Sequence, residues 1–315
     1  MIQCQTLSLD LQIFHISDGP CHTPEENDNL KQMKEHPMPT VESFLRIFNS
    51  RTPLDNTLYQ DEKNTLWANR YYSVIRLLRL IYIPYRWVIA YPLFGLSTVF
   101  FTTLCTILVF TRGPRIASKY AGTPWARLAC HITPALVSVK GRHHLSKEQS
   151  YVVVANHQSH YDILIIYGWL GVDFKWVMKH TIRKIPFIGY CCNLLGHIFI
   201  DRSDTTTAIR SIENAKTRIK DGTSIFFFPE GTRSDDSQVQ PFKKGAFRLA
   251  LDLGLPILPI TLQGTGNVLP KNSAALLPGK IEMTMHPPID TSSYSTENIK
   301  DLIDLTRSII QGNDR

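Results

Sequence analysis

The apolar and polar positions of this chain divide it into three regions. Residues 1–65 show no sustained hydrophobic period, and residues 17–39 are rich in Pro, Glu, Asn, Asp and His, which is typical of disorder. Residues 66–122 are dominated by apolar side chains, whereas residues 123–315 alternate short apolar runs with helix-like stretches. The pattern therefore predicts a disordered leader, a helical apolar region and one folded domain, in that order.

The longest apolar run lies between Trp87 and Phe110 and contains no charged residue. Its length is enough for a helix to cross the hydrocarbon core of a bilayer. Residues 71–87 combine Ile, Leu and Tyr with three arginines, the composition of an interfacial amphipathic segment. Because both flanks are basic, the charge rule leaves two arrangements open. One is a single span, and the other is a helical hairpin that bends near Pro92 and Gly95.

The folded domain is predicted from the order of its apolar runs. Strands are expected at residues 151–155, 174–178, 197–200, 224–228, 257–263 and 280–286, and helices at residues 161–170, 205–220, 244–253 and 296–311. Strands that alternate with helices indicate an α/β domain built on one central, largely parallel sheet flanked by helices.

The charge and composition of the chain indicate what kind of molecule it binds. The formal net charge of +7 and the pI of about 9.1 favour anionic partners. The basic residues form no dense stripe and no nucleic-acid-binding motif, so we expect a lipid headgroup or a phosphate and no nucleic acid. The six cysteines include no CxxC pair, which favours reduced thiols in a cytosol-facing protein and no metal site.

The first candidate site is the sequence NHQSHYD at residues 156–162. It follows a predicted strand, and ligands of open α/β sheets gather at the carboxyl ends of strands. If the next helix begins at Ser159, His157 lies in the preceding turn and folds back toward Asp162. A carboxylate on one imidazole nitrogen fixes the tautomer and leaves the other nitrogen free to accept a proton. His160 is a neighbouring alternative, but it stands only two residues from Asp162.

The second candidate site is the turn PEGTRS at residues 229–234, which follows a predicted buried strand. Gly231 permits close approach of a ligand, and Thr232 and Arg233 are suitable donors to a phosphate. Lys243 and Lys244 then open a helix whose N-terminal amides also favour an anion. Arg202, at the end of another predicted strand, is expected at the same sheet edge.

Four ordered blocks together resemble the glycerolipid acyltransferase family, and most of all the 1-acyl-glycerol-3-phosphate acyltransferases. The blocks are NHQSHYD, residues 196–202, FPEGTRS and LPILPI, and the resemblance extends over about residues 70–290. It implies a glycerolphosphate acyltransferase-like fold, with a membrane-embedded helical region at residues 66–122 and the catalytic domain at residues 123–315. The leader of residues 1–65 is not part of the family pattern.

The resemblance also implies a chemistry. His157 is the expected general base on the acceptor hydroxyl, oriented by Asp162. The residues associated with the acceptor glycerophosphate are Arg202, Glu230, Gly231, Thr232 and Arg233. Since a carboxylate repels phosphate, Glu230 is expected to bind an acceptor hydroxyl or to orient Arg202 or Arg233.

The expected reaction forms phosphatidic acid from lysophosphatidic acid, with acyl-CoA or acyl-carrier protein as the donor substrate and no bound cofactor. We expect the enzyme at a lipid bilayer, with its catalytic domain facing the cytoplasm. Alternatives are glycerol 3-phosphate, another lysophospholipid or a lyso-aminolipid as the acceptor, and coenzyme A-independent transacylation. A serine hydrolase would need a G-x-S-x-G elbow, which the sequence lacks, and a non-catalytic membrane adaptor would have no need of an intact His157 and Asp162.

Overall fold

The computed structural model describes residues 41–49, 66–201, 221–234 and 238–312, together with residues 211, 213, 216 and 219. The chain divides into two compact units, residues 1–44 and residues 45–315. Most of the predicted leader lies outside the described residues, and within it the structure describes helix α2 (Val41–Asn49). The sheet and the helices around it belong to the second unit.

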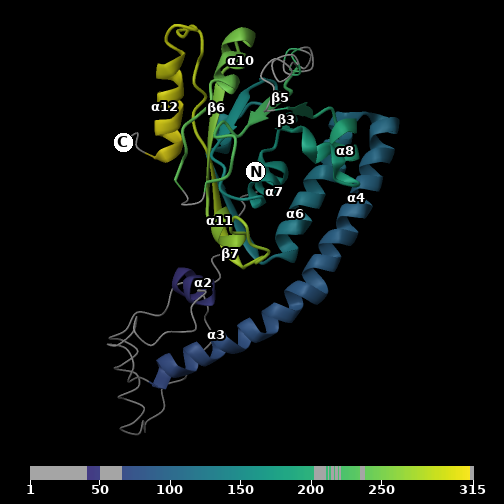
Figure 1. Ribbon diagram of the computed structural model, residues 1–315, viewed down its shortest axis with the longest axis vertical. Coiled ribbons are helices and arrows are strands. Elements are labelled where there is room, and N and C mark those ends of the chain that lie inside the picture. Colours follow the sequence, from purple (N-terminus) through teal and green to yellow (C-terminus); the bar gives the residue numbers. More distant parts are fainter. Residues whose placement is uncertain are drawn as a thin grey trace, which may run out of the picture. The chain divides into compact units, whose positions relative to one another are not determined.

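A seven-stranded sheet forms the centre of the second unit (Figure 1). Its strands, in spatial order, are β1 (Ala135–Lys140), β7 (Gly279–Met285), β6 (Ile257–Gln263), β2 (Val152–Ala155), β5 (Ser224–Phe227), β3 (Phe174–Lys179) and β4 (Ile198–Ile200). All neighbours pair in parallel except β6 and β7, which are antiparallel. The prediction of a largely parallel central sheet is confirmed.

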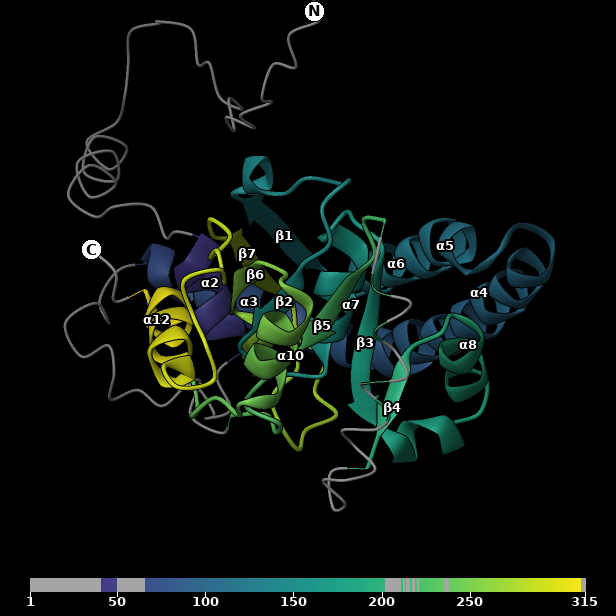
Figure 2. The same ribbon diagram turned by 90° about the horizontal axis from the view of Figure 1, so that it is seen from above.

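Helices cover the sheet on both faces (Figure 2). One face packs against α6 (Thr123–Ile132) and α7 (Tyr161–Trp169), with α8 (Ile188–Leu194) close by, and the other against α10 (Gly245–Leu253) and α12 (Ile299–Gln311). The central strand β2 serves both cores, since Val153 and Ala155 join the first cluster and Val152 and Val154 the second. A strand that is buried on both faces consists of a continuous run of apolar residues, which explains why β2 could be predicted from the sequence.

The apolar region is one long helix. The π-helical turn Arg86–Ala90 joins α3 (Leu66–Tyr85) to α4 (Tyr91–Arg112), and residues 73–112 run without interruption. Pro92 directly follows this π-helical turn, and the helix continues through it, so the chain does not bend back there. The hairpin arrangement is therefore absent from these residues, and one helix has the length and composition to cross a membrane.

One side of this helix is attached to the folded domain along its length. The Tyr82 hydroxyl donates to the Leu276 carbonyl at 3.2 Å and the Tyr85 hydroxyl to the Ile132 carbonyl at 2.8 Å. Farther along, Trp125 Nε1 donates to Thr98 Oγ1 at 3.1 Å. The remaining surface exposes large apolar side chains, among them Leu80, Ile81, Val88, Leu96, Phe100 and Phe110. The helix is thus bound to the domain on one side and apolar on the other.

Strand β1 and helices α6 and α8 were not predicted from the sequence. Along β1, half-buried Ala135, Val137 and Val139 alternate with exposed positions, and Leu136 lies on the exposed face, which obscures the pattern. The helix expected at residues 205–220 lies almost wholly outside the described residues. Arg202 also lies outside them.

Candidate active site

The two predicted motifs meet at the carboxyl ends of β2 and β5, which are neighbours in the sheet. Strand β2 ends at Ala155 because the side chain of Asn156 takes over its pairing with β6. The Asn156 amide donates to the Leu262 carbonyl at 2.9 Å and accepts from the Leu262 N–H at 2.8 Å. The chain then turns away from the sheet at His157, which leaves the imidazole at the strand end.

His157 and Asp162 form a hydrogen-bonded dyad. His157 Nδ1 lies 2.8 Å from Asp162 Oδ2, and the aspartate side chain is fully buried. Since the carboxylate only accepts, Nδ1 carries the proton in this dyad, and Nε2 is left as the nitrogen that can accept one. The arrangement holds a base in one tautomer and one orientation.

The start of α7 explains how a spacing of five residues closes the dyad. Helix α7 begins at Tyr161, as the apolar pattern predicted, so His157 lies in the turn before it. Asp162 Oδ2 also accepts from the backbone N–H groups of Gln158 and Ser159, at 2.8 and 2.9 Å. The carboxylate thus caps the turn and orients the imidazole with the same oxygen, and the expectation that the helix begins after His157 is confirmed.

Phe228 fixes the plane of the imidazole. The two rings stack with centroids 3.9 Å apart and planes 11° apart, and Trp176 packs on the far side of Phe228 at 5.7 Å. Phe228 was not predicted from the sequence, because nothing distinguishes it from the other phenylalanines that end this buried strand.

Glu230 touches the backbone of the dyad. Its Oε1 accepts from the His157 N–H at 2.6 Å and its Oε2 from the Gln240 N–H at 3.0 Å, and the residue is buried. Burial raises the pKa of Glu230 to about 7, in spite of these two hydrogen bonds. In return, the His157 carbonyl accepts from the Ser234 N–H at 2.9 Å. The turn 229–234 is therefore bonded to the histidine from both ends.

The remainder of the turn carries the basic groups. Gly231 adopts φ +78°, and a Cβ built on it would lie 2.8 Å from Lys243 Nζ, so the lysine packs directly over the glycine. The Arg233 carbonyl accepts from Lys271 Nζ at 2.8 Å, and Thr232 is exposed. Burial lowers the pKa of His160, and the positive charge of Arg233 adds to this effect.

The structure therefore gathers most of the predicted site residues at one edge of the sheet. His157, Asp162 and Glu230 are in contact, and Gly231, Thr232 and Arg233 belong to the turn bonded to His157. Lys271, in the segment after β6, donates to the Arg233 carbonyl in this turn, and no sequence motif predicted it. Among the described residues, no three His, Cys, Asp or Glu side chains are grouped to hold a metal ion.

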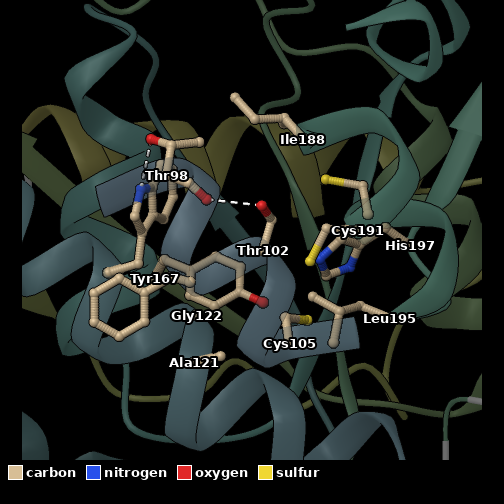
Figure 3. Close-up of a pocket in the computed structure, with 13 residues that line it drawn as sticks. Thr98, Thr102, Cys105, Ala121, Gly122, Tyr167, Ile188, Cys191, Leu195 and His197 are labelled. Atoms are coloured by element: carbon tan, nitrogen blue, oxygen red, sulfur yellow. Dashed lines mark hydrogen bonds between the residues drawn. The ribbon is translucent and has the colours of Figure 1, made fainter. Parts of the chain in front are cut away.

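A separate cavity of about 60 Å³ lies between α4, α7 and α8 (Figure 3). Tyr167, Cys191 and His197 line it, whereas His157 and Asp162 do not. Burial lowers the pKa of His197 to about 3, so this imidazole is neutral, and its Nδ1 accepts from the Trp176 N–H at 3.3 Å. The cavity has room for only a few water-sized molecules, and it is distinct from the dyad.

Comparison with known proteins places these features in a wider group. Residues 136–263 match the family model described as Acyltransferase. A chloroplastic 1-acyl-sn-glycerol-3-phosphate acyltransferase of Brassica napus is 37% identical over 186 residues, which are 58% of this chain and 53% of that protein. A 1-acyl-sn-glycerol-3-phosphate acyltransferase of Chlamydomonas reinhardtii is 30% identical over 262 residues, 82% of this chain and 74% of the relative.

A solved structure shares the fold. The crystal structure of the 1-acyl-sn-glycerophosphate acyltransferase PlsC from Thermotoga maritima matches with a TM-score of 0.56 and 28% identity, over 71% of this chain and 96% of that one. Among the curated relatives, the chain spans about half the length of the Brassica napus protein and about three quarters of the Chlamydomonas reinhardtii protein.

Proposed function

The chain belongs to the acyltransferase family that includes the 1-acyl-sn-glycerol-3-phosphate acyltransferases, and from that premise we propose that it acylates lysophosphatidic acid. The donor is an acyl thioester, either acyl-CoA or acyl-carrier protein, and the product is phosphatidic acid. The observation that carries the proposal is the dyad, His157 Nδ1 at 2.8 Å from buried Asp162, at the sheet edge to which the turn 229–234 is bonded.

In this mechanism His157 Nε2 takes the proton of the acceptor hydroxyl. The hydroxyl oxygen bonds to the thioester carbonyl carbon, the C–S bond then breaks, and the leaving thiolate recovers a proton from the imidazolium. Asp162 stabilises the imidazolium that forms in between. General-base catalysis of this kind contributes about 10²- to 10⁴-fold, and positioning and charge stabilisation supply the rest.

The acceptor phosphate is assigned to the cationic side of the site. Arg233 belongs to the turn that is bonded to His157, and Lys243 lies over Gly231 of the same turn, so both are suited to neutralise an anion beside the hydroxyl that His157 activates. The predicted role of Arg202 in binding this phosphate stays a prediction, since the residue lies outside the described part of the chain.

Glu230 receives a different role from the one expected. Both of its carboxylate oxygens accept from backbone N–H groups, one of them on His157 itself, and Glu230 is buried. We therefore propose that Glu230 is a positioning residue that holds His157 and the turn 229–234 together, rather than a ligand of the acceptor.

The long apolar helix is the proposed membrane attachment. Contacts to the folded domain extend along it from Tyr82 to Thr98, so a helix that crossed the bilayer would have to carry this side of the domain into the lipid. The exposed apolar side instead fits a helix that lies in one leaflet, with the site next to the surface and the domain in the cytoplasm.

An acceptor panel tests the function. The purified chain is given a radiolabelled acyl thioester with lysophosphatidic acid, glycerol 3-phosphate, other lysophospholipids or a lyso-aminolipid, and the products are identified by chromatography. We expect labelled phosphatidic acid as the main product, and none from His157→Ala.

Three results would contradict the proposal. Preference for another acceptor would reassign the substrate, and transfer from a phospholipid without any thioester would make the protein a transacylase. Thioester consumption without an acceptor would make it a hydrolase.

A further inference from the structure

A second apolar surface stands at the corner between β3 and α8. We name residues 185–190 the Phe187 corner. Three of its side chains are large, apolar or aromatic, and open to solvent: Ile185 is 46% exposed, Phe187 54% and Tyr190 55%. Large apolar side chains scattered singly over a surface need no explanation, but three within six residues do.

The corner is held in one conformation. The Gly189 N–H donates to the Ile185 carbonyl at 2.8 Å, and the Cys191 N–H donates to the Phe187 carbonyl at 2.9 Å. A Cβ at Gly189 would collide with the backbone of Arg183. Phe187 itself has φ +60° and ψ −57°, a region that a bulky residue seldom adopts. The fold thus tolerates a strained backbone that turns an aromatic ring outward.

The corner lies beside the apolar helix. Helices α4 and α8 pack side by side in both views (Figures 1 and 2), and the small cavity between them is lined by Thr102 and Cys105 from α4 and by Cys191 and Cys192 from α8. Phe187 and Tyr190 are thus exposed next to a helix whose own free surface is apolar.

The charges around the corner are mainly positive, and the nearby carboxylate of Asp201 lies 3.6 Å from His180 Nδ1. Residues 174–200 contain no Asp or Glu, and Lys179, Arg183 and Lys184 are exposed. Aromatic tips next to basic side chains match the interface of a bilayer with an anionic surface, where each nearby Lys or Arg adds attraction.

We propose that the Phe187 corner is a second membrane contact, which inserts its apolar side chains into the anionic leaflet next to α4. The inference rests on the membrane attachment in the proposed function. A single helix lying in a leaflet leaves the domain free to roll about the helix axis. A second contact away from that axis fixes the roll, and with it the height of His157 above the lipid.

Fluorescence quenching tests the contact without reference to activity. Phe187→Trp and, as a second position, Tyr190→Trp are bound to anionic vesicles that contain brominated-chain lipids. The emission added by the new tryptophan is obtained by subtracting the wild type, which contains five. Lys300→Trp is the matched control, because Lys300 is exposed on α12, which covers the face of the sheet opposite α6 and α7. We expect bromine to quench the tryptophan introduced at either corner position at least twofold more than the control.

Each other outcome has a definite meaning. Equal quenching in Phe187→Trp and Lys300→Trp, with the protein bound to the vesicles, overturns the second contact but leaves the function intact. Failure of the wild type to float with vesicles overturns the attachment on which the inference rests. Acyl transfer to lysophosphatidic acid dispersed in detergent reports separately on the proposed chemistry.

Lys184→Gln tests the charge. Loss of one lysine at an anionic surface is expected to weaken vesicle binding about fivefold, and to have no effect on vesicles of phosphatidylcholine alone. The control is Lys300→Gln on α12, an exposed lysine on the other face of the sheet. The same loss in both variants would show only an effect of net charge and would contradict the proposal.

Discussion

At the scale of single residues, the chemistry depends on one carboxylate oxygen. Asp162 Oδ2 accepts from His157 Nδ1 and from two backbone N–H groups. We expect Asp162→Asn to lower kcat by about 10²- to 10⁴-fold, because a neutral amide no longer stabilises the imidazolium. Stopped assays of thioester consumption with lysophosphatidic acid measure the change.

His160→Gln is the matched control for this prediction. His160 lies in the same turn and within the field of Arg233, but it makes no bond to the carboxylate in the structure. Near-normal turnover is expected. A loss as large as that of Asp162→Asn would show that the dyad has been assigned to the wrong histidine.

Glu230 should make the stability of the fold depend on pH. Its pKa is about 7 in the folded protein, above the usual value of 4.5, so the folded state binds the proton more tightly than the unfolded state. The free energy of unfolding should therefore fall as pH rises from about 4.5 to about 7, by roughly 3 kcal/mol at most. Above about pH 7 this contribution is constant.

Glu230→Gln should remove that slope. Denaturant titrations of both proteins at several pH values give the difference, which isolates this carboxyl from the other titrating groups. We also expect kcat to fall while KM for lysophosphatidic acid changes little, since one backbone N–H loses its acceptor. A raised KM with unchanged kcat would return Glu230 to the acceptor site.

The reactive residues could be predicted from the sequence better than the residues that hold them in place. His157, Asp162 and Arg233 stand in short motifs at strand ends, and the order of four such blocks along the chain made them candidates together. Phe228 and Lys271 act through contacts between segments far apart in the chain, and an apolar ring or a lone lysine has no local signature. A carboxylate at Glu230 was not expected to bind phosphate, but only the fold shows that its partners are backbone N–H groups.

At the scale of elements, the turn 229–234 should respond to a single methyl group. Gly231→Ala forces a side chain into φ +78° and pushes against Lys243 Nζ. We expect a loss of about 1 kcal/mol of stability, and a severalfold higher KM for lysophosphatidic acid because Lys243 is displaced.

Gly254→Ala separates these two effects. Gly254 also has positive φ, at +59°, but a Cβ there meets nothing within 4 Å. It should show the backbone cost in thermal unfolding and a normal KM. Equal changes of KM in the two variants would refute the placement of Lys243 at the acceptor site.

Element prediction succeeded where burial is complete. The strands β2, β5 and β6 are mostly or wholly buried, so they read as continuous apolar runs between turn residues. Edge strand β1 and the short helix α8 are half-exposed. Which of their residues are buried depends on the segments that pack against them, so their sequences show no clear apolar period. The alternative of a hairpin was wrong because the helix continues through Pro92, which directly follows the π-helical turn Arg86–Ala90.

At the scale of the whole molecule, the decisive question is on which side of the bilayer each end of the apolar helix lies. A single span would put Ser73 and Arg112 on opposite sides. Contacts of Tyr82, Tyr85 and Thr98 with the folded domain instead hold the helix against it over most of the apolar length. Since the backbone and polar groups of that domain are costly to place in lipid, we expect both ends of the helix on the side of the catalytic domain.

Cysteine accessibility decides between the two arrangements. Ser73→Cys and Arg112→Cys are made in a background whose six native cysteines are replaced by serine, and sealed membranes are treated with an impermeant maleimide from one side at a time. Both positions should react from the same side as Lys300→Cys on α12, which marks the catalytic domain. Reaction of the two ends from opposite sides would make the helix a true span, and the domain would then have to release at least one of its hydrogen bonds to it.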